Sequence, residues 1–415
     1  MGIELGELRF RSGQRVTRDA AFPIGSITKT FTATLAMILV DDGDLELDAP
    51  LDEYLPDVSL ADVTLRQLLS HTSGLPCDPD AEDLTCPTIA RYVREHAVTC
   101  PPVLPPGAAF SYSNMGYVLV GRLIEIATGM SWREAMSSIL LQPLGIQPAY
   151  IVGREGAAGG RPIASGHSVN RAAARTRPVG QSLAACEAPA GALAVSAMDL
   201  VALGRAHLDG TAGELLPART AAQMRTPVPA ADPFGLAEGW GLGLAVFQGS
   251  DGDWVGHDGN ADGTACYLRL DPRTGSVIAL TSNANTGLSL WRDLLGELAQ
   301  AGLGIEPAST WKADTRPVPP PAGAAGTFVN GGVEYRVLDR KDGLYLVADD
   351  APPSRITCYE GLAFSVADPI SGQVLFGGRF LRDGFAGRID AVQLSGRLAR
   401  RRGPARQRGR GERSA

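Results

Sequence analysis

The 415-residue sequence predicts a mixed α/β (α+β) protein, and three observations support this. Two apolar stretches in the first third have the length and all-round apolarity of buried helices. Farther along, short strand-type runs alternate with tight turns, which is typical of an antiparallel sheet. A Pro-rich linker then precedes a segment that holds strand-type runs alone. We therefore expect a large N-terminal domain of helices around an antiparallel sheet, and a small all-β domain after it.

The composition is that of an ordinary globular protein, with 44% apolar and 20% charged residues. The net charge of −7 does not indicate binding of nucleic acid by the chain as a whole. No run approaches the roughly 18 apolar residues of a membrane span. The six cysteines lack metal-ligand spacing, so we expect no metal site and no disulfide-dense scaffold. Cys77, Cys86 and Cys100 share one Pro-rich region, where a disulfide is an alternative that stays open.

In chain order, a short strand is expected at 5–10, before the first apolar helix at 26–41. Ser26 and Lys29 lie three positions apart, so in a helix their Cβ atoms are roughly 5–6 Å from each other. A serine attacks a carbonyl only when a neighbouring base takes its proton, and a lysine is such a base once burial lowers its pKa. The alternative is that Ser26 caps the helix and Lys29 lies in its first turn.

A short helix at 64–70 ends in Ser70-His71-Thr72-Ser73-Gly74-Leu75. At such a helix end we expect His71 to satisfy backbone groups rather than to catalyse. A Pro-rich loop then leads through Phe110-Ser111-Tyr112-Ser113-Asn114 to the second apolar helix, 115–128, which Gly129 closes. Tyr112 and Asn114 flank Ser113, so an extended loop points both to one side. An ordinary helix cap at Ser113 or Asn114 is the alternative.

The remaining elements of the large domain follow at short intervals. Residues 154–182 have no periodicity and are expected to form a long surface excursion near a site. A capping box at Ser196-Ala197-Met198-Asp199 opens a helix that continues to 208. Strands are expected at 239–247, 254–255, 265–270 and 276–281, followed by a helix at 288–301.

Between two of these strands lies His257-Asp258-Gly259-Asn260-Ala261-Asp262-Gly263. Its glycines permit close backbone approach, which suits a site that holds an oxyanion with backbone N–H groups. A hairpin that uses glycines for turn geometry explains the stretch equally well.

Ser-x-x-Lys, Tyr-x-Asn and His-x-Gly thus occur in this order, each at the end of an apolar element. In this combination the sequence resembles the serine β-lactamase-like, penicillin-recognising superfamily. It is most similar to the branch that contains class C β-lactamases, D,D-peptidases, D-amino-acid amidases, family VIII esterases and acyltransferases. The resemblance extends to Ala190-Gly191 and Gly241-Leu242-Gly243, and covers roughly the first three hundred residues.

The resemblance implies an antiparallel sheet flanked by helices, with an additional all-helical lobe. It also implies roles for single residues: Ser26 is the acylated nucleophile, Lys29 its partner base, and Tyr112 the proton shuttle. How the base role divides between Lys29 and Tyr112 stays open. Asn114 would hold the substrate amide, and the N–H groups of Ser26 and Asn260 would form the oxyanion hole. His257 replaces a lysine of the family and would contact Tyr112, which tunes proton transfer.

The sequence departs from the family pattern in two places. Where the family has Lys-Thr-Gly, this chain has His257-Asp258-Gly259, so it lacks a cation and a hydroxyl that help to bind a substrate carboxylate. If Asp258 faces the pocket, like-charge repulsion disfavours an anionic acyl donor and leaves esters, amides, thioesters and cationic substrates. Second, only 25 residues precede Ser26, so either the start lies upstream or the sheet lacks an edge strand. Because 1–8 lacks the features of a secretory signal, we expect a cytoplasmic protein, subject to that uncertain start.

The expected domains are a catalytic domain at 1–312, a Pro-rich linker at 313–325, a small β domain at 326–396 and a tail at 397–415. In relatives such a β domain is barrel-like and walls the active site or mediates oligomerisation. The tail holds eight arginines, and we expect it to be disordered, with nucleic-acid contact as the minor interpretation.

We therefore expect a serine acyl-enzyme hydrolase or acyltransferase that acts on an ester, amide or thioester without a cofactor. Its partners would be a small-molecule acyl donor and an amine or alcohol acceptor, with neither nucleic acid nor membrane. The alternatives are an amide-forming transacylase of natural-product biosynthesis, a D-amino-acid peptidase or amidase, a β-lactamase, and a catalytically silent binding protein. A regulatory protein that acts through the arginine tail is a further alternative. The joint presence of Ser26, Lys29, Tyr112, Asn114 and His257 disfavours the silent protein.

Overall fold

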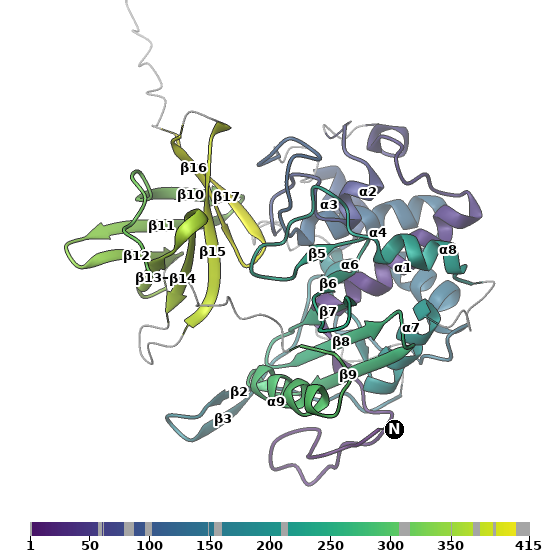
Figure 1. Cartoon of the computed structure of the whole chain (residues 1–415). Coiled ribbons are helices and arrows are strands. Elements are labelled where there is room, and N and C mark those ends of the chain that lie inside the picture. Colours follow the sequence, from purple (N-terminus) through teal and green to yellow (C-terminus); the bar gives the residue numbers. More distant parts are fainter. Residues whose placement is uncertain are drawn as a thin grey trace, which may run out of the picture. The chain divides into compact units, whose positions relative to one another are not determined.

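The chain divides into two compact units, which a computed structural model describes at 2–56, 60, 62–78, 87–95, 102–147, 149–152, 160–208, 215–306, 316–349, 351–367, 374–384 and 387–403 (Figure 1). The first unit comprises Met1–Thr310 with Ser395–Arg397, and the second comprises Trp311–Leu394 with Leu398–Ala415. No helix among the described residues is long and apolar enough to cross a membrane. Cys86 and Cys100 lie outside these residues, so the structure does not bear on the disulfide alternative.

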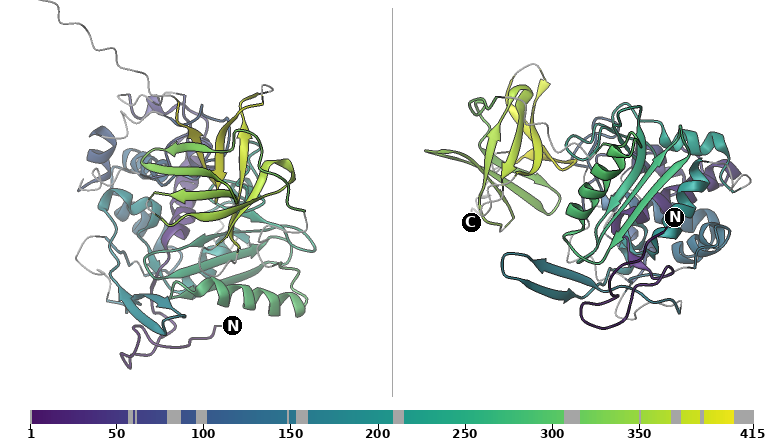
Figure 2. Two further views of the ribbon diagram at one scale, coloured as in Figure 1. Left: turned by 90° about the vertical axis from the view of Figure 1, so that its left-hand side faces the viewer. Right: turned by 60° about the horizontal axis from the view of Figure 1, so that its bottom comes forward.

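A five-stranded antiparallel sheet in the order β5-β6-β7-β8-β9 forms one layer of the first unit. Its strands are β5 (Gly239–Trp240), β6 (Ala245–Phe247), β7 (Trp254–Gly259), β8 (Ala265–Asp271) and β9 (Ser276–Ser282). Helix α9 (Gly287–Gln300) lies across one face (Figure 2). On that face Trp291 stacks on Tyr267, with ring centroids 4.9 Å apart. Helix α7 (Ala197–Leu208) packs against β8 and β9 on the opposite face. The antiparallel sheet flanked by helices is confirmed.

The helical lobe is built around α1 (Thr28–Asp42), which is buried from Thr28 to Leu39 and ends at Gly43. Gly43 has a φ of 85°, a left-handed conformation that glycine adopts without strain. Helices α2 (Leu65–Leu69), α3 (Ile89–Glu95), α4 (Asn114–Thr128), α5 (Trp132–Ala135), α6 (Ala188–Gly191) and α8 (Ala218–Arg225) complete the described helices. Short helical turns occur at η1 (Gly25–Ile27), η2 (Leu51–Glu53), η5 (Met136–Leu141) and η6 (Ala185–Glu187). Helix α1 packs against α4 and α6, which holds its first turn in the interior.

Two expectations for the first unit differ from the structure. At 5–10 there is an isolated bridge between Glu7 and Arg15 instead of a strand, because Leu5 and Phe10 are exposed and only Leu8 packs against the core. In the expected excursion at 154–182, the strands β2 (Gly166–Asn170) and β3 (Arg175–Val179) pair as a hairpin. Most of its side chains are exposed, so no alternation of apolar and polar residues marks it in the sequence. A further pair, β1 (Phe22–Pro23) with β4 (Ala194–Val195), lies beside the start of α1.

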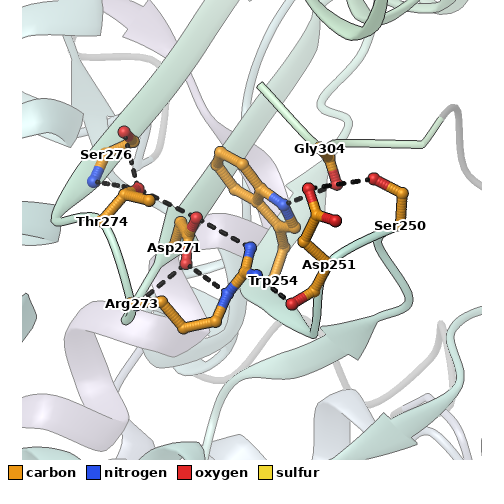
Figure 3. Close-up of polar contacts among 8 residues, drawn as sticks. All are labelled: Ser250, Asp251, Trp254, Asp271, Arg273, Thr274, Ser276 and Gly304. Carbon is orange, nitrogen blue, oxygen red and sulfur yellow. Dashed lines mark hydrogen bonds and ion pairs between the residues drawn. The ribbon is translucent and has the colours of Figure 1, made fainter. Parts of the chain in front are cut away.

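The β8–β9 turn is fixed by a polar network that Figure 3 shows. The Asp271 carboxylate accepts hydrogen bonds from the backbone N–H of Arg273 at 2.9 Å and from Thr274 Oγ1 at 2.9 Å. Arg273 also forms an ion pair with Asp271 at 3.0 Å and donates to the Asp251 carbonyl. Trp254 Nε1 donates to the Gly304 carbonyl at 3.3 Å. One end of β7 and β8 is thereby locked by paired polar groups.

The second unit is a closed barrel in the order β10-β11-β12-β13-β14-β15-β16-β17. Its strands are β10 (Gly326–Asn330), β11 (Val333–Arg340), β12 (Gly343–Ala348), β13 (Ser354–Cys358), β14 (Ala363–Ala367), β15 (Val374–Arg382), β16 (Ile389–Leu394) and β17 (Arg397–Arg401), with the turn η7 (Glu360–Leu362) before β14. The barrel-like fold is thus confirmed, but the disorder expected from Arg397 onward is corrected. Strand β17 pairs with β10 and buries Leu398 and Ala399, so the arginines around them stand on a strand. Residues 404–415 lie outside the described part.

Candidate active site

Ser26 and Lys29 lie side by side at the start of α1. Ser26 belongs to the turn η1, and Lys29 Nζ is 3.2 Å from Ser26 Oγ. Lys29 Nζ also donates to the Ala190 carbonyl at 2.8 Å, and the Lys29 side chain is fully buried. Burial lowers the pKa of Lys29 to about 7, with Asp78 opposing this shift and Arg397 of the same unit adding to it. A large fraction of Lys29 is therefore neutral near pH 7 and able to accept a proton.

The Tyr-x-Asn loop is held by His71. The Ser111 N–H donates to the His71 carbonyl at 2.8 Å, and the Ser113 N–H donates to His71 Nδ1 at 3.1 Å. The His71 ring lies 4.2 Å from the Tyr112 ring, between centroids. Burial holds the pKa of His71 well below its usual range, so the ring stays neutral and Nδ1 keeps its lone pair. The structural role expected for His71 is confirmed, and His71 fixes the position of Tyr112.

Tyr112 brings a buried phenol next to Ser26. Its Oη has no hydrogen-bond partner among the described residues. Burial raises the pKa of Tyr112 well above its ordinary value, and the nearby Ser26 hydroxyl opposes this rise. Lys29 Nζ lies 5.0 Å from the centroid of the Tyr112 ring. Tyr112 therefore keeps its proton in the resting site and can donate it to a leaving group.

His257 offers a buried lone pair on the sheet side of the site. Its Nδ1 is 2.6 Å from the Asp258 carbonyl oxygen, and because a carbonyl can only accept, Nδ1 carries the hydrogen. Burial lowers the pKa of His257 to about 3, so the ring is neutral and Nε2 has a lone pair. Nε2 has no partner among the described residues. The expected contact with Tyr112 is an edge contact of the rings, with centroids 6.3 Å apart.

Two glycines bring the end of β7 against the turn that carries Ser26. A Cβ atom on Gly259 would lie 1.9 Å from the Ile24 carbonyl oxygen. A Cβ atom on Gly25 would lie 2.1 Å from the Asn260 carbonyl oxygen. Any larger residue at either position would push the two segments apart. The glycine of His-x-Gly therefore places the backbone of Asn260 beside Ser26, as an oxyanion hole shared by both residues requires.

Asp258 does not belong to the pocket. In the β7–β8 ladder it pairs with Tyr267, on the face that α9 covers. Its carboxylate forms an ion pair of 2.5 Å with Arg269, whose guanidinium lies 3.4 Å from the centroid of the Phe247 ring. The condition for repelling an anionic donor, that Asp258 faces the pocket, is therefore not met. Side chains alternate along a strand, so His257 and Asp258 point to opposite faces.

A pocket of about 310 Å³ opens beside the nucleophile, and Ser26, Asn114 and Asn260 line it. The other lining residues are Gly25, Ile151, Gln181, Ser182, Leu183, Glu187, Ala190, Gly191, Ala261 and Asp262. The Asn114 amide donates through Nδ2 to the Asp78 carboxylate, which fixes its orientation. The structure thus brings Ser26, Lys29, Tyr112, Asn114, His257 and Asn260 together. Their catalytic roles stay predictions.

Sequence reasoning missed three features of the site. The carbonyl that orients Lys29 belongs to Ala190, in a dipeptide that the resemblance had included without a role. The carboxylate that orients Asn114 belongs to Asp78, in a Pro-rich loop without periodicity. Glu187 lines the pocket just before Ala190. None of these positions carries a local signal, because each depends on segments that meet only in the folded chain.

Comparisons with known proteins show which proteins the chain is similar to. A sequence model of the family described as Beta-lactamase matches residues 6–303. Penicillin-binding protein 4 of Amycolatopsis lactamdurans is 36% identical over 352 residues, which cover 79% of this chain and 89% of that protein. The crystal structure of SurE is 40% identical with a TM-score of 0.85, and the match covers 96% of this chain and 91% of SurE. SurE with D-Leu has a TM-score of 0.83 at the same identity and coverage. A D-stereospecific amidohydrolase from Streptomyces sp. is 30% identical with a TM-score of 0.54, covering 64% of this chain and 83% of that chain.

Proposed function

Because the chain belongs to the β-lactamase family and is a serine hydrolase of that superfamily, we propose that it works through an acyl-enzyme on Ser26. One observation carries the proposal. Lys29 Nζ lies 3.2 Å from Ser26 Oγ in a fully buried position that lowers its pKa to about 7. A neutral amine at hydrogen-bond distance from a hydroxyl is the arrangement that general-base activation of a serine needs.

In acylation, neutral Lys29 takes the Ser26 proton while Oγ attacks the carbonyl of the donor. The N–H groups of Ser26 and Asn260 stabilise the oxyanion of the tetrahedral intermediate. When this intermediate collapses, the bond to the leaving group breaks, and Tyr112 gives its proton to that group. The Lys29 ammonium then returns a proton to Tyr112, so both residues regain their resting states. Before Tyr112 gives its proton away, His257 Nε2 positions the Tyr112 hydroxyl by accepting its hydrogen bond, and that bond breaks when the proton moves to the leaving group.

In the second half-reaction an acceptor attacks the acyl-enzyme. The acceptor's proton passes to the Tyr112 and Lys29 pair, and a proton ends on Ser26 Oγ as the ester bond to the enzyme breaks. Water as acceptor gives hydrolysis, whereas an amine or alcohol gives acyl transfer. We propose both outcomes for an ester, amide or thioester donor, with formation of an amide by an amine acceptor as the leading transfer reaction.

The substrate that we propose has a D-configured residue at the reacting carbonyl. Two observations favour a substrate with a D-configured residue over a β-lactam antibiotic. SurE, which is 40% identical, has been solved with D-Leu, and another similar structure is that of a D-stereospecific amidohydrolase. In addition, His257 replaces the lysine with which the resembling lactamases bind a carboxylate, and burial keeps this histidine neutral. A site without that fixed cation is expected to bind the carboxylate of a β-lactam poorly.

The test is covalent labelling read by intact-protein mass. The purified full chain and Ser26→Ala are each treated with p-nitrophenyl esters of D- and L-amino acids, a D-amino-acid amide, a fluorophosphonate and a fluorescent β-lactam. We expect an adduct on Ser26 that is absent in Ser26→Ala, with faster labelling by D-esters than by L-esters. A folded wild-type protein that gains no mass with any probe would contradict the proposal and favour the binding-protein alternative. Adding amines or alcohols to the trapped species separates transfer from hydrolysis.

A further inference from the structure

The pocket beside Ser26 is lined by acidic charge. Glu187 and Asp262 belong to its lining, and among the described lining residues there is no lysine, arginine or histidine. Asp78 adds a third carboxylate just behind Asn114, to which it is hydrogen-bonded. Such a pocket favours a cationic group over a neutral one, and a neutral one over an anion. Of these carboxylates, Glu187 lines the pocket directly, whereas Asp78 is engaged by Asn114.

Glu187 is held by the same short segment that orients Lys29. It ends η6 and occupies the N-cap position of α6. Three residues later, the Ala190 carbonyl accepts from Lys29 Nζ. The Pro189 carbonyl accepts from Thr32 Oγ1 at 2.8 Å, and α6 packs against α1 and α4. A packed helix on α1, rather than an exposed loop, therefore fixes the position of Glu187 relative to Ser26.

The Glu187 carboxylate forms no ion pair with any cation of the described residues, although the charge of Lys29 acts on it. Asp258 and Asp271 each form an ion pair with an arginine, at 2.5 Å and 3.0 Å. The backbone N–H of Glu187 donates to the Ala184 carbonyl at 3.0 Å, but its half-buried carboxylate makes no hydrogen bond or ion pair with another described residue. Lys29 is engaged with Ser26 and Ala190. A half-buried carboxylate without a partner costs stability, and a bound cation would offset that cost.

Electrostatics at Glu187 agree with this geometry. Burial raises the pKa of Glu187, and the charge of Asp78 raises it further, while Lys29 lowers it. The ionised form is thus disfavoured when the pocket is empty, and a cation in the pocket would favour it.

We propose that Glu187 forms an ammonium-binding subsite in the acyl pocket, which selects substrates that present a protonated primary amine close to the Ser26 acyl bond. The proposal rests on the function proposed above, since the subsite acts on the acyl-enzyme. The ammonium belongs either to the acyl donor or to the acyl acceptor. In the acceptor case, the nitrogen forms the new C–N bond and loses two protons. One of these ends on Ser26 Oγ as its bond to carbon breaks, and the other leaves through Lys29 to solvent.

Two pairs of isosteric compounds distinguish the sources. For the donor, kcat/KM is compared for p-nitrophenyl 6-aminohexanoate and p-nitrophenyl heptanoate, which differ in a terminal ammonium or methyl group. For the acceptor, the acyl-enzyme formed from p-nitrophenyl heptanoate is partitioned between butylamine and 1-butanol. Each ratio is measured in wild type, in Glu187→Gln and in Glu297→Gln. Glu297→Gln removes the same charge from an exposed position on α9, so it is the matched control.

We expect Glu187→Gln to lower one of the two ratios by about tenfold or more, the effect of losing one charge-assisted hydrogen bond. Glu297→Gln should change neither ratio by more than about twofold, because salt screens a distant surface charge. A fall in the donor ratio assigns the subsite to the donor, and a fall in the acceptor ratio assigns it to the acceptor. In wild type, the affected ratio should also decrease with added salt, a readout that needs no variant.

Ratios that are unchanged in Glu187→Gln and insensitive to salt in wild type, with normal acylation of Ser26, would overturn the subsite alone. Failure of every ester to acylate wild-type Ser26 would overturn the proposed function and the subsite with it. The two failures are therefore distinguishable by the mass of the intact protein.

Discussion

The two ends of strands β7 and β8 differ in how their polar side chains are satisfied. At the end drawn in Figure 3, Asp271 accepts from Arg273 and Thr274, and the Trp254 indole donates to the Gly304 carbonyl. At the other end, Tyr112 Oη and His257 Nε2 are buried without a hydrogen-bond partner among the described residues. The polar groups at one end of β7 and β8 are therefore fully hydrogen-bonded, whereas the groups beside the other end are not.

This difference separates a structural end of the sheet from a reactive one. A buried polar atom without a partner costs about 1–3 kcal/mol, and beside Ser26 a substrate or a transition state can supply the partner that Tyr112 and His257 lack. A saturated network has nothing left to offer a ligand, and its effect is on stability. The comparison therefore predicts that substitutions near Ser26 change activity more than stability, whereas substitutions in the β8–β9 turn do the reverse.

Lys29→Met should lower activity more than substitution of His257, Asp271 or Asp258 does. Removal of the general base is expected to lower the rate of Ser26 acylation by about 10²- to 10⁴-fold. The measurement is single-turnover labelling with a neutral p-nitrophenyl ester. If Lys29→Met is acylated as fast as wild type, Lys29 is not the general base.

Lys29→Met should also remove a pH dependence of stability. The pKa of Lys29 is about 7 in the folded chain against 10.5 for an ordinary lysine, so between these values the unfolded chain binds more protons. The Lys29 contribution to the free energy of unfolding therefore rises with pH across that window. Urea unfolding at several pH values should show this rise in wild type and a flatter curve in Lys29→Met.

His257→Ala should lower acylation less than Lys29→Met does, by about 10- to 100-fold, because it removes an acceptor that positions the Tyr112 proton. Its effect on stability lies at acid pH. The pKa of His257 is about 3 in the folded chain and 6.5 for an ordinary histidine, so its contribution is present above pH 6.5 and is lost as the pH falls towards 3. Acid unfolding followed by circular dichroism should be less steep in His257→Ala, and an identical profile would contradict a buried neutral ring.

Asp271→Asn should change stability and leave catalysis alone. It replaces a charged acceptor of Arg273 and Thr274 by a neutral one, which is expected to cost about 1–3 kcal/mol of unfolding free energy. Chemical denaturation measures this loss, and kcat/KM under native conditions should stay within about twofold of wild type. A large loss of kcat/KM at unchanged stability would break the comparison between the two ends.

Asp258→Asn should have the smallest effect on substrate choice. It leaves the buried Arg269 guanidinium without its ion pair, so the unfolding free energy should fall. The relative kcat/KM for cationic and neutral esters should stay as in wild type, because Asp258 lies on the α9 face. A marked loss of preference for cationic donors in Asp258→Asn would contradict the placement of Asp258 outside the pocket.

The parts of the fold that follow local patterns could be predicted from the sequence. The apolar run after Ser26 and the glycine at Gly43 predicted α1, and the capping box at Ser196 predicted α7, as observed. The β2–β3 hairpin was missed because exposed strands carry no alternation of apolar and polar residues. The strand β17 was missed because its arginines resemble a disordered tail, whereas Leu398 and Ala399 between them are buried.

The candidate site was predictable where its residues lie in short motifs at element ends. Ser26 and Lys29 share a helix turn, and Tyr112 and Asn114 share a loop, so spacing alone places each pair. The face of the sheet on which the Asp258 side chain lies was not predictable, because the register of β7 against β8 decides which side chain points to the pocket. The environment of Glu187 depends on contacts between α6 and two distant helices, which no local pattern encodes.

The pH dependence of Ser26 acylation tests the central claim most directly. The rate constant for labelling wild-type protein with a neutral p-nitrophenyl ester is measured by intact mass between pH 5 and 9. If neutral Lys29 is the base, the rate constant should rise with pH, reach half of its maximum near pH 7 and then level off. A rate constant that is independent of pH, or that rises without levelling off up to pH 9, would contradict a site built around a buried lysine of lowered pKa.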